Sequence, residues 1–280
     1  MSAAEQRHYI SICGKGGAGM KIIVCIKQVP GTNEVKMDPV TNTIIRENVP
    51  AIINPFDTYA IEEAARIKEK YGAEVCGLSM GIPAASEMLR EAVSLGVDRA
   101  VLLTDRKFAG ADTLATSYTL SRGVEKIGGF DLIICGKQAS DGDTAQVGPS
   151  LAKTLGIAYA TDISKIIRIN ENSMRCMKIT DDGYEEIEIK LPALITVVKE
   201  INMPRLPSIK SMRTARRAEI EIAAFNDVGA DETRAGLKGS PTQVKKTFVP
   251  MHEISSVTLD GTAEEKAKEL AEILIDIVRR

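Results

Sequence analysis

The chain has 280 residues, a formal net charge of −2, 44% hydrophobic residues and 26% charged residues. This balance is typical of a soluble globular protein and gives no general attraction to nucleic acid or anionic lipid. No apolar run approaches the roughly 18 residues that a membrane-spanning helix needs. The length suits one large domain, or a domain with an appendage.

Five cysteines occur, at positions 13, 25, 76, 135 and 176, and no two have C-x-x-C spacing. This pattern favours reduced, buried thiols in a cytoplasmic protein. The two histidines, His8 and His252, lie beside no cysteine, so we expect no metal site. They also offer no Ser–His or Cys–His pair, which argues against a hydrolase or transferase.

Residues 1–19 precede Met20, which stands directly before a strand-like run, and we interpret them as an N-terminal extension outside the fold. The sequence GKGGAG at 14–19 lacks the Lys and hydroxyl residue that close a phosphate-binding loop, and a strand rather than a helix follows it. We therefore prefer a flexible linker to an ATPase loop.

Apolar strand-like runs alternate with helical patterns from residue 21 to about 155. The runs are rich in Val, Ile and Leu with little polar alternation, as in parallel strands that are covered on both faces. Asn54 is expected to cap a helix that starts at Pro55 and ends at Gly72. The expected strands are 22–26, 74–80, 100–104 and 132–135, and further helices are expected over 83–95 and 112–127. This order predicts an α/β, Rossmann-like parallel sheet flanked by helices.

The pattern changes after residue 160. Alternating runs at 163–170, 174–179 and 184–189 predict a small antiparallel extension, and 191–198 is one more buried strand. We therefore expect a Rossmann-like nucleotide-binding domain over 20–200.

Residues 201–280 show no core of their own, and we expect them to form an arm that packs on this domain or on another subunit. Thr262 and Glu265 have the spacing of a capping box before a final amphipathic helix. The apolar stripe of that helix is Ala267, Leu270, Leu274, Ile277 and Val278.

The stretch GKQASDGDTAQVGP, residues 136–149, follows the carboxyl end of an expected strand, where open parallel sheets bind ligands. Gly136 and Gly142 would let backbone N–H groups approach a ligand closely, and a helix from about Gly148 would aim its first amides at a phosphate. These features suit an adenine nucleotide, although an ordinary polar loop with an N-cap is the competing interpretation. Its side chains suited to a ribose or a helix start are Asp141, Asp143, Thr144 and Gln146.

Five ordered motifs resemble the small (beta) subunits of electron-transfer flavoproteins from Met20 to the C-terminus: IIVCIKQVP, NPFDTYAIEEAARIKEKYG, SMG, GKQASDGDTAQVGP and PRLPSIKSMRTAR. The resemblance implies a Rossmann-like domain paired with a larger alpha subunit. It also implies a nucleotide site at the positions that match the family. These are Cys25, Asn54, Pro55, Phe56, Asp57, Met80, Gly136, Lys137, Gln138, Ala139, Ser140, Asp141, Gly142, Asp143, Thr144, Ala145, Gln146 and Val147.

The family has two branches, which differ in the nucleotide held at this site. One branch holds structural AMP. The other holds a second FAD, which takes a hydride from NADH and sends one electron to ferredoxin or flavodoxin and the other through the alpha-subunit FAD to a dehydrogenase. This chain resembles the second, electron-bifurcating branch, because Gly142 and Ala145 are small and Asp57 stands where the AMP branch tends to carry Cys. The flavin, rather than any side chain, would then carry the chemistry.

The basic stretch after residue 204 is either a solvated arm or, as the resemblance implies, a loop that docks on an acyl-CoA, enoyl-CoA or lactate dehydrogenase. In the docking interpretation an apolar anchor is accompanied by cations that steer toward an acidic surface. A nucleic-acid role is disfavoured because the cluster is short and has no interleaved aromatic residues. A small nucleotide-binding module resembling universal stress proteins is disfavoured by the length and the arm. The anchor is Leu206, and the cations are Lys210, Arg213, Arg216 and Arg217.

Overall fold

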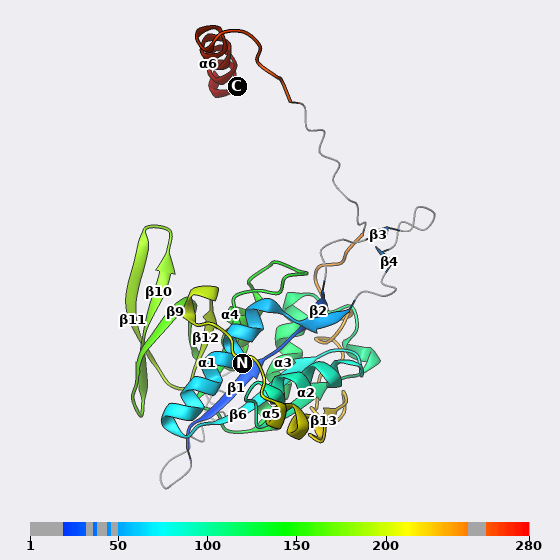
Figure 1. Ribbon diagram of the computed structural model, residues 1–280. Coiled ribbons are helices and arrows are strands. Elements are labelled where there is room, and N and C mark those ends of the chain that lie inside the picture. The colour runs from blue at the N-terminus through cyan, green and yellow to red at the C-terminus, as the bar shows by residue number, and fades with distance from the viewer. Residues whose placement is uncertain (1–18, 32–35, 38–43, 46–49, 246–255, 280) are drawn as a thin grey trace, which may run out of the picture.

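A computed structural model describes residues 19–31, 36–37, 44–45, 50–245 and 256–279. A nine-stranded sheet with helices on both faces forms its centre (Figure 1). The N-terminal extension other than Gly19 lies outside the described residues, as do Cys13 and both histidines.

The strand order of the sheet is β11-β10-β9-β12-β8-β1-β6-β7-β13. The strands from β9 to β13 in this order run parallel, whereas β10 and β11 are antiparallel. This arrangement confirms the predicted α/β sheet and its antiparallel extension. The strands are β1 (Lys21–Cys25), β6 (Glu74–Met80), β7 (Arg99–Leu103), β8 (Leu132–Gly136), β9 (Ala158–Ile169), β10 (Ser173–Thr180), β11 (Gly183–Lys190), β12 (Ala193–Val197) and β13 (Ile220–Ala223).

The order of the strands creates a switch point between β1 and β8. The chain runs from β1 outward through β6 and β7 on one side and then returns to place β8 on the other side of β1. The connections that leave β1 and β8 therefore diverge at the carboxyl edge of the sheet, which is where open parallel sheets bind ligands.

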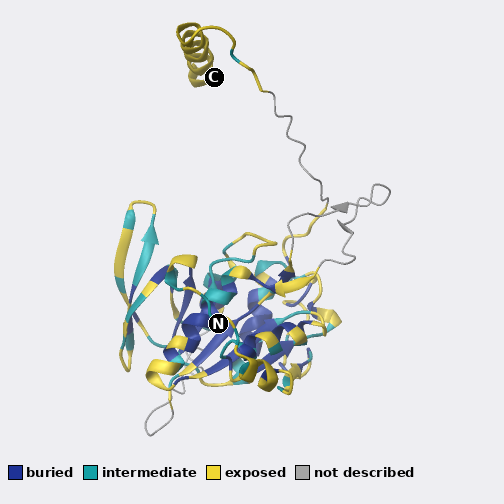
Figure 2. Cartoon of the chain, in the orientation of Figure 1, coloured by how far each residue is buried: buried dark blue, intermediate teal, exposed yellow. Residues whose placement is uncertain are grey.

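Helices cover both faces of the sheet because its parallel strands are apolar on both sides (Figure 2). Alternate residues of β1 divide between two cores: Ile22 and Val24 pack with α1 and α2, whereas Ile23 and Cys25 pack with α3 and α4. The described helices are α1 (Pro55–Tyr71), α2 (Ala85–Ser94), α3 (Thr113–Ile127), α4 (Val147–Leu155), α5 (Ile209–Ala215) and α6 (Ala263–Arg279), with short 3-10 turns at Arg106–Phe108 and Lys199–Ile201. Two-stranded ribbons pair β2 (Gln28–Pro30) with β5 (Ala51–Ile53) and β3 (Lys36–Met37) with β4 (Ile44–Ile45).

The helices begin and end near the residues that the sequence predicts, but the Asn54 side chain does not cap α1. Gly72 ends α1 in the left-handed conformation at φ 71°, and the carboxylate of Asp112 caps α3 by accepting from the N–H groups of Leu114 and Ala115. Asn54 occupies the N-cap position of α1, but its side chain makes no capping hydrogen bond. The expectation of a capping side chain at Asn54 was wrong, because that side chain is used elsewhere.

The first part of the C-terminal segment packs on the sheet domain. Strand β13 pairs with β7, and Phe225, Val228 and Ala235 are buried in the core beneath α3. Further along, the N–H and hydroxyl of Thr242 donate to the Asp112 carboxylate at 3.1 and 2.8 Å. Of the two surfaces considered for residues 201–280, the stretch up to 245 thus uses the one on its own domain.

The final helix, α6, stands apart from the sheet domain (Figure 1). Its capping box is confirmed, because Thr262 N–H donates to Glu265 Oε2 at 2.8 Å and Glu265 N–H donates back to Thr262 Oγ1 at 3.4 Å. No residue of α6 is buried, so its apolar stripe is exposed (Figure 2). Among the helices of the described ranges, none has the length and apolarity that crossing a lipid bilayer requires.

Candidate functional site

The loop between β8 and α4, residues 136–147, lies at the switch point of the sheet. It leaves the carboxyl end of β8, and Lys137 N–H donates to the carbonyl of Val197 at the end of β12 at 2.9 Å. The central residues Ser140–Thr144 are exposed. The loop therefore presents polar groups at the edge where a nucleotide was expected.

The Asn54 side chain fixes the position of this loop by two hydrogen bonds. Its buried side chain donates from Nδ2 to the carbonyl of Gln138 at 2.8 Å and accepts from Ser140 N–H at Oδ1 at 3.0 Å. An amide that is satisfied at both ends by backbone groups acts as a fixed bridge, because leaving either end unpaired in a buried position would cost about 1–3 kcal/mol. The loop position is thus set by the first residue before α1.

Asp57, one turn into α1, ties the ends of β1 and β8 together. Its buried carboxylate accepts from Lys27 N–H at 2.7 Å, directly after β1. Burial raises the pKa of Asp57 to about 7, although hydrogen bonds from Lys27, Asn54 and Gly136 oppose the shift. The carboxyl group therefore titrates near neutral pH.

The two loop glycines have different roles. A Cβ on Gly136 would lie 2.5 Å from Asp57 Oδ1 and 2.6 Å from the carbonyl carbon of Phe56, so Gly136 makes room for α1. A Cβ on Gly142 would meet nothing within 4 Å. Gly136 is therefore closely packed against α1, whereas the space beside Gly142 is open. The expected approach of both backbones to a ligand stays a prediction.

The backbone of the loop is strained at two non-glycine residues. Asp143 and Ala145 have φ values of 51° and 52°, in the left-handed region that such residues rarely occupy. Asp143 N–H donates to the carbonyl of Ala139 at 2.8 Å, and Gln138 Nε2 donates to the Asp143 carboxylate. Strain of this kind costs roughly 1–3 kcal/mol per residue and is concentrated at ligand sites.

Lys27 and Thr113 complete the surroundings of the loop and were not expected from the sequence. Lys27 Nζ contacts Asp141 Oδ1 at 2.6 Å, and Thr113 Oγ1 donates to Gln146 Oε1 at 3.1 Å. Lys27 lies between β1 and β2, and Thr113 is the first residue of α3. Their positions at the carboxyl edge of the sheet were the signal by which the sequence could have indicated them.

The helix α4 begins at the exit of the loop. Gln146 is its N-cap residue and makes no side-chain capping bond. The first amides of α4 therefore have no side-chain acceptor from their cap, which leaves a helix N-terminus of the kind that binds phosphate. Together with the open space at Gly142, this end of the loop fits the phosphates of a nucleotide.

The remaining expected positions lie at the margins of the site. Phe56 and Met80 are partly buried, and Pro55 is exposed. Cys25 is buried beside Cys135, its register partner on β8, and a hydrogen bond with the Cys25 thiol together with burial raises the pKa of Cys135 well above its usual range. With its pKa raised, the Cys135 thiol stays protonated and does not act as a nucleophile. Within the described part of the chain, no three His, Cys, Asp or Glu side chains come close enough to hold a metal ion.

The expected docking residues form a second surface. Leu206 is 91% exposed, and the four cations on and after α5 are exposed as well. Arg205, which we did not single out, lies between α1 and Leu206 and contacts α1. The structure thus separates the loop of residues 136–147 from the basic segment and places α1 in contact with both.

Comparison with known proteins identifies one family. The profile described as "Electron transfer flavoprotein domain" matches residues 41–228. The chain is 49% identical to an "Electron transfer flavoprotein subunit beta" of Thermoanaerobacterium thermosaccharolyticum, over 91% of this chain and 98% of that protein. It is 47% identical to the "Caffeyl-CoA reductase-Etf complex subunit CarD" of Acetobacterium woodii, over 87% and 93%. It is 44% identical to "Protein FixA" of Azorhizobium caulinodans, over 88% and 90%.

We expect the Asp57 carboxyl group to make stability depend on pH. Burial raises its pKa from the ordinary value of 3.8 to about 7 in the fold, so the folded state holds the proton more tightly than the unfolded state. The resulting stabilisation is complete below about pH 4 and is lost as the pH rises through about 7. Between pH 5 and pH 8 the wild type should lose about 2.5 kcal/mol of unfolding free energy that Asp57→Asn does not lose.

Denaturant unfolding at pH 5, 6, 7 and 8 measures this difference. Asp260→Asn, at an exposed aspartate, is the matched control and should follow the wild type. Parallel pH profiles for the wild type and Asp57→Asn would show that the buried carboxyl group does not titrate in this range.

Proposed function

Because the chain belongs to the electron transfer flavoprotein beta-subunit family, we propose that it binds FAD at the loop of residues 136–147 and takes part in electron transfer from NADH. The observation that carries this proposal is the loop itself, which lies at the switch point of the sheet, is fixed by the buried Asn54 and exposes strained backbone and polar side chains. The protein partner in this proposal is an electron-transfer-flavoprotein alpha subunit, with which the chain forms a cytoplasmic heterodimer.

The loop residues hold the adenine-nucleotide part of the cofactor. The exposed segment Ser140–Thr144 and the side chain of Gln146 supply polar partners for a ribose, and the first turn of α4 faces the phosphates. Lys27 adds a positive charge beside Asp141. When bound, FAD supplies hydride acceptance from NADH and electron transfer to ferredoxin or flavodoxin and to the alpha-subunit FAD. The role of this chain is to bind, orient and enclose it.

FAD is favoured over structural AMP by residues around the loop. Asp57 stands where the AMP-holding branch tends to carry Cys, and Gly142 and Ala145 are small where that branch tends to carry bulkier residues. One similar protein is named as a subunit of a caffeyl-CoA reductase–Etf complex, which agrees with a subunit that serves a dehydrogenase. AMP remains the alternative ligand, and with AMP the chain would be a scaffold without a flavin of its own.

The basic segment is proposed to dock on the dehydrogenase that receives the electrons, an acyl-CoA, enoyl-CoA or lactate enzyme. Leu206 projects from it almost fully exposed. Exposed apolar side chains flanked by cations suit an acidic partner with an apolar pocket. The cations Lys210, Arg213, Arg216 and Arg217 form no ion pair with any other described residue.

Replacing polar loop residues should weaken flavin retention. In the heterodimer, Asp143→Ala combined with Gln146→Ala removes two side chains of the loop, and Asn54→Ala separately removes the bridge beneath it. We expect each variant to lose flavin during gel filtration, because either bound contacts or the position of the loop is lost. The ratio of flavin to protein after acid release measures this loss.

The control for this measurement is Asp182→Ala, at the exposed turn between β10 and β11, which should retain flavin as the wild type does. Thermal unfolding of each variant separates flavin loss from unfolding. Full flavin content in the Asp143→Ala, Gln146→Ala variant would mean that the nucleotide lies elsewhere.

The exposed stripe of α6 is proposed to bind the alpha subunit. Leu270, Leu274, Ile277 and Val278 present their apolar side chains to solvent, and burying such side chains yields about 1.5–3 kcal/mol each. Deleting residues 256–280 should therefore abolish heterodimer formation in size-exclusion chromatography. Lys266→Ala with Glu272→Ala alters only charges of the helix and should leave the heterodimer intact. A normal heterodimer from the truncated chain would contradict this role of α6.

A further inference from the structure

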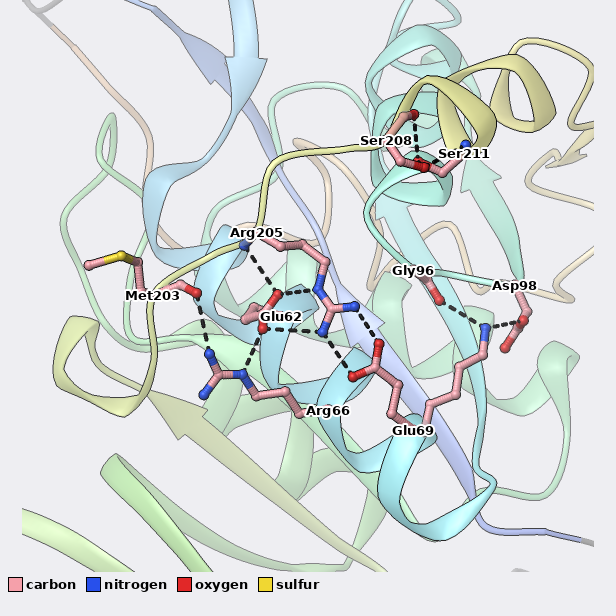
Figure 3. Close-up of polar contacts among 10 residues, drawn as sticks. Glu62, Arg66, Glu69, Gly96, Asp98, Met203, Arg205, Ser208 and Ser211 are labelled. Atoms are coloured by element: carbon pink, nitrogen blue, oxygen red, sulfur yellow. Dashed lines mark hydrogen bonds and ion pairs between the residues drawn. The ribbon is translucent and has the colours of Figure 1, made fainter.

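The segment that leads into Leu206 lies along α1. Asn202 Nδ2 donates to the carbonyl of Tyr59 and to Glu63 Oε2, both at 3.0 Å. One turn further along the helix, Arg66 Nη2 donates to the carbonyl of Met203 at 3.4 Å (Figure 3). The backbone before Leu206 is therefore fixed to the helix by polar contacts and not by a hydrophobic core.

Arg205 makes the strongest of these attachments. Its N–H and Nε donate to Glu62 Oε2 at 3.2 and 2.7 Å, and Nη2 donates to Glu62 Oε1 at 3.3 Å and to Glu69 Oε2 at 3.2 Å. Nη1 also contacts the Glu69 carboxylate. Figure 3 shows the guanidinium group lying between these two carboxylates of α1. A planar group that engages two carboxylates along its edges has both its position and its orientation defined.

The buried position of Glu62 distinguishes this cluster from an ordinary surface ion pair. Surface pairs contribute about 0–1 kcal/mol, but the Glu62 side chain is only 4% exposed and accepts from both Arg205 and Arg66. Burial alone would raise the pKa of Glu62, whereas the hydrogen bonds from the two arginines outweigh it and hold the pKa below its usual range. The cluster stays charged at neutral pH.

Arg205 and Leu206 point in opposite directions. The guanidinium group of Arg205 lies on α1, whereas the next residue, Leu206, is 91% exposed, as expected for successive residues of an extended backbone. Two residues after Leu206, Ser208 caps α5, which packs on α2. Leu206 therefore lies between two residues, Arg205 and Ser208, whose positions are fixed by hydrogen bonds. Leu206 itself stays exposed.

We propose that Arg205 is a positioning residue, which fixes the Leu206 segment in the conformation that docks on the partner dehydrogenase. The inference rests on the docking function proposed above and adds the residue that prepares the surface. A segment that is already ordered loses less conformational freedom when it binds, so affinity rises without any new contact to the partner.

A purely structural role makes a different prediction. If Arg205 only attached the C-terminal segment to the domain, its loss would lower thermal stability and leave partner binding unchanged. If it positions Leu206, its loss should loosen the Met203–Leu206 backbone and weaken docking, while flavin content and turnover at saturating partner stay unchanged. Arg66 still pairs with Glu62 when Arg205 is replaced, so no buried charge is left without a partner.

The first test is hydrogen exchange in the intact heterodimer carrying Arg205→Gln. We expect faster exchange of the amide of residue 205, whose N–H donates to Glu62 Oε2 in the wild type, and no change in the core strands. Arg99→Gln is the matched control. It removes a different ion-paired arginine, because Arg99 on β7 pairs with Glu74 on β6. Unchanged exchange at 203–206 in Arg205→Gln would overturn the proposal.

The second test measures docking on whichever of an acyl-CoA, an enoyl-CoA and a lactate dehydrogenase the wild-type heterodimer reduces. Arg205→Gln should raise the KM for that enzyme about tenfold at unchanged kcat. Arg205→Lys should be intermediate, because a point charge cannot engage both carboxylates as the planar group does. Arg99→Gln should match the wild type.

Leu206→Ala distinguishes the positioning role of Arg205 from the docking function of the segment. A raised KM for Leu206→Ala together with an unchanged KM for Arg205→Gln would overturn the positioning role and keep the docking surface. An unchanged KM for both would overturn the docking function itself. If Arg205→Gln fails to fold, Glu69→Gln, at an exposed carboxylate, provides the same comparison with a smaller expected rise in KM.

Discussion

The buried side chain of Asn54 joins α1 to the loop after β8 by two hydrogen bonds. The position of the loop, and with it the candidate site, depends on these two bonds. The loop has few apolar contacts of its own, since its central residues are exposed and its backbone is strained at Asp143 and Ala145. An exposed loop of this kind would sample many conformations. The Asn54 amide hydrogen-bonds both the carbonyl of Gln138 and the N–H of Ser140. The loop is therefore held in one position by a helix that is packed against the sheet.

The same helix carries the contacts of the second surface. Its N-terminal residues Asn54 and Asp57 contact the loops after β8 and β1, and its later carboxylates Glu62 and Glu69 hold Arg205. Helix α1 therefore relates the position of the loop after β8 to the position of the basic segment. For the flavin-binding role proposed above, in which the cofactor carries the chemistry, defining such positions is the main task of the chain.

Most of the fold could be predicted from the sequence because its determinants are local. The strands 74–80 and 132–135 are apolar on both faces, and Gly72 and Asp112 mark helix ends by their own conformation or side chain. Strand β13 was missed because it has only four residues, which alternate Ile with Glu and Ala, and it follows the short helix α5 in a segment without a strong apolar run.

Two functional details could not be predicted because they depend on contacts between distant parts of the chain. Asn54 has the sequence features of a helix cap, yet its partners lie 84 and 86 residues away. Arg205 was one cation among several, and its carboxylate partners on α1 lie 143 and 136 residues earlier. The loop itself could be singled out from the sequence because its polar residues follow an apolar strand directly, and the family resemblance pointed to the same residues.

The flavin content of the heterodimer decides whether the loop of residues 136–147 holds FAD or AMP. The chain is co-expressed with its alpha subunit, the purified heterodimer is treated with acid, and the released FAD and AMP are counted. We expect two FAD per heterodimer, one of which is bleached by NADH before any dehydrogenase is added, and loss of one FAD in the Asn54→Ala variant. One FAD and one AMP per heterodimer would contradict FAD binding at the loop and would make the loop the holder of a structural nucleotide.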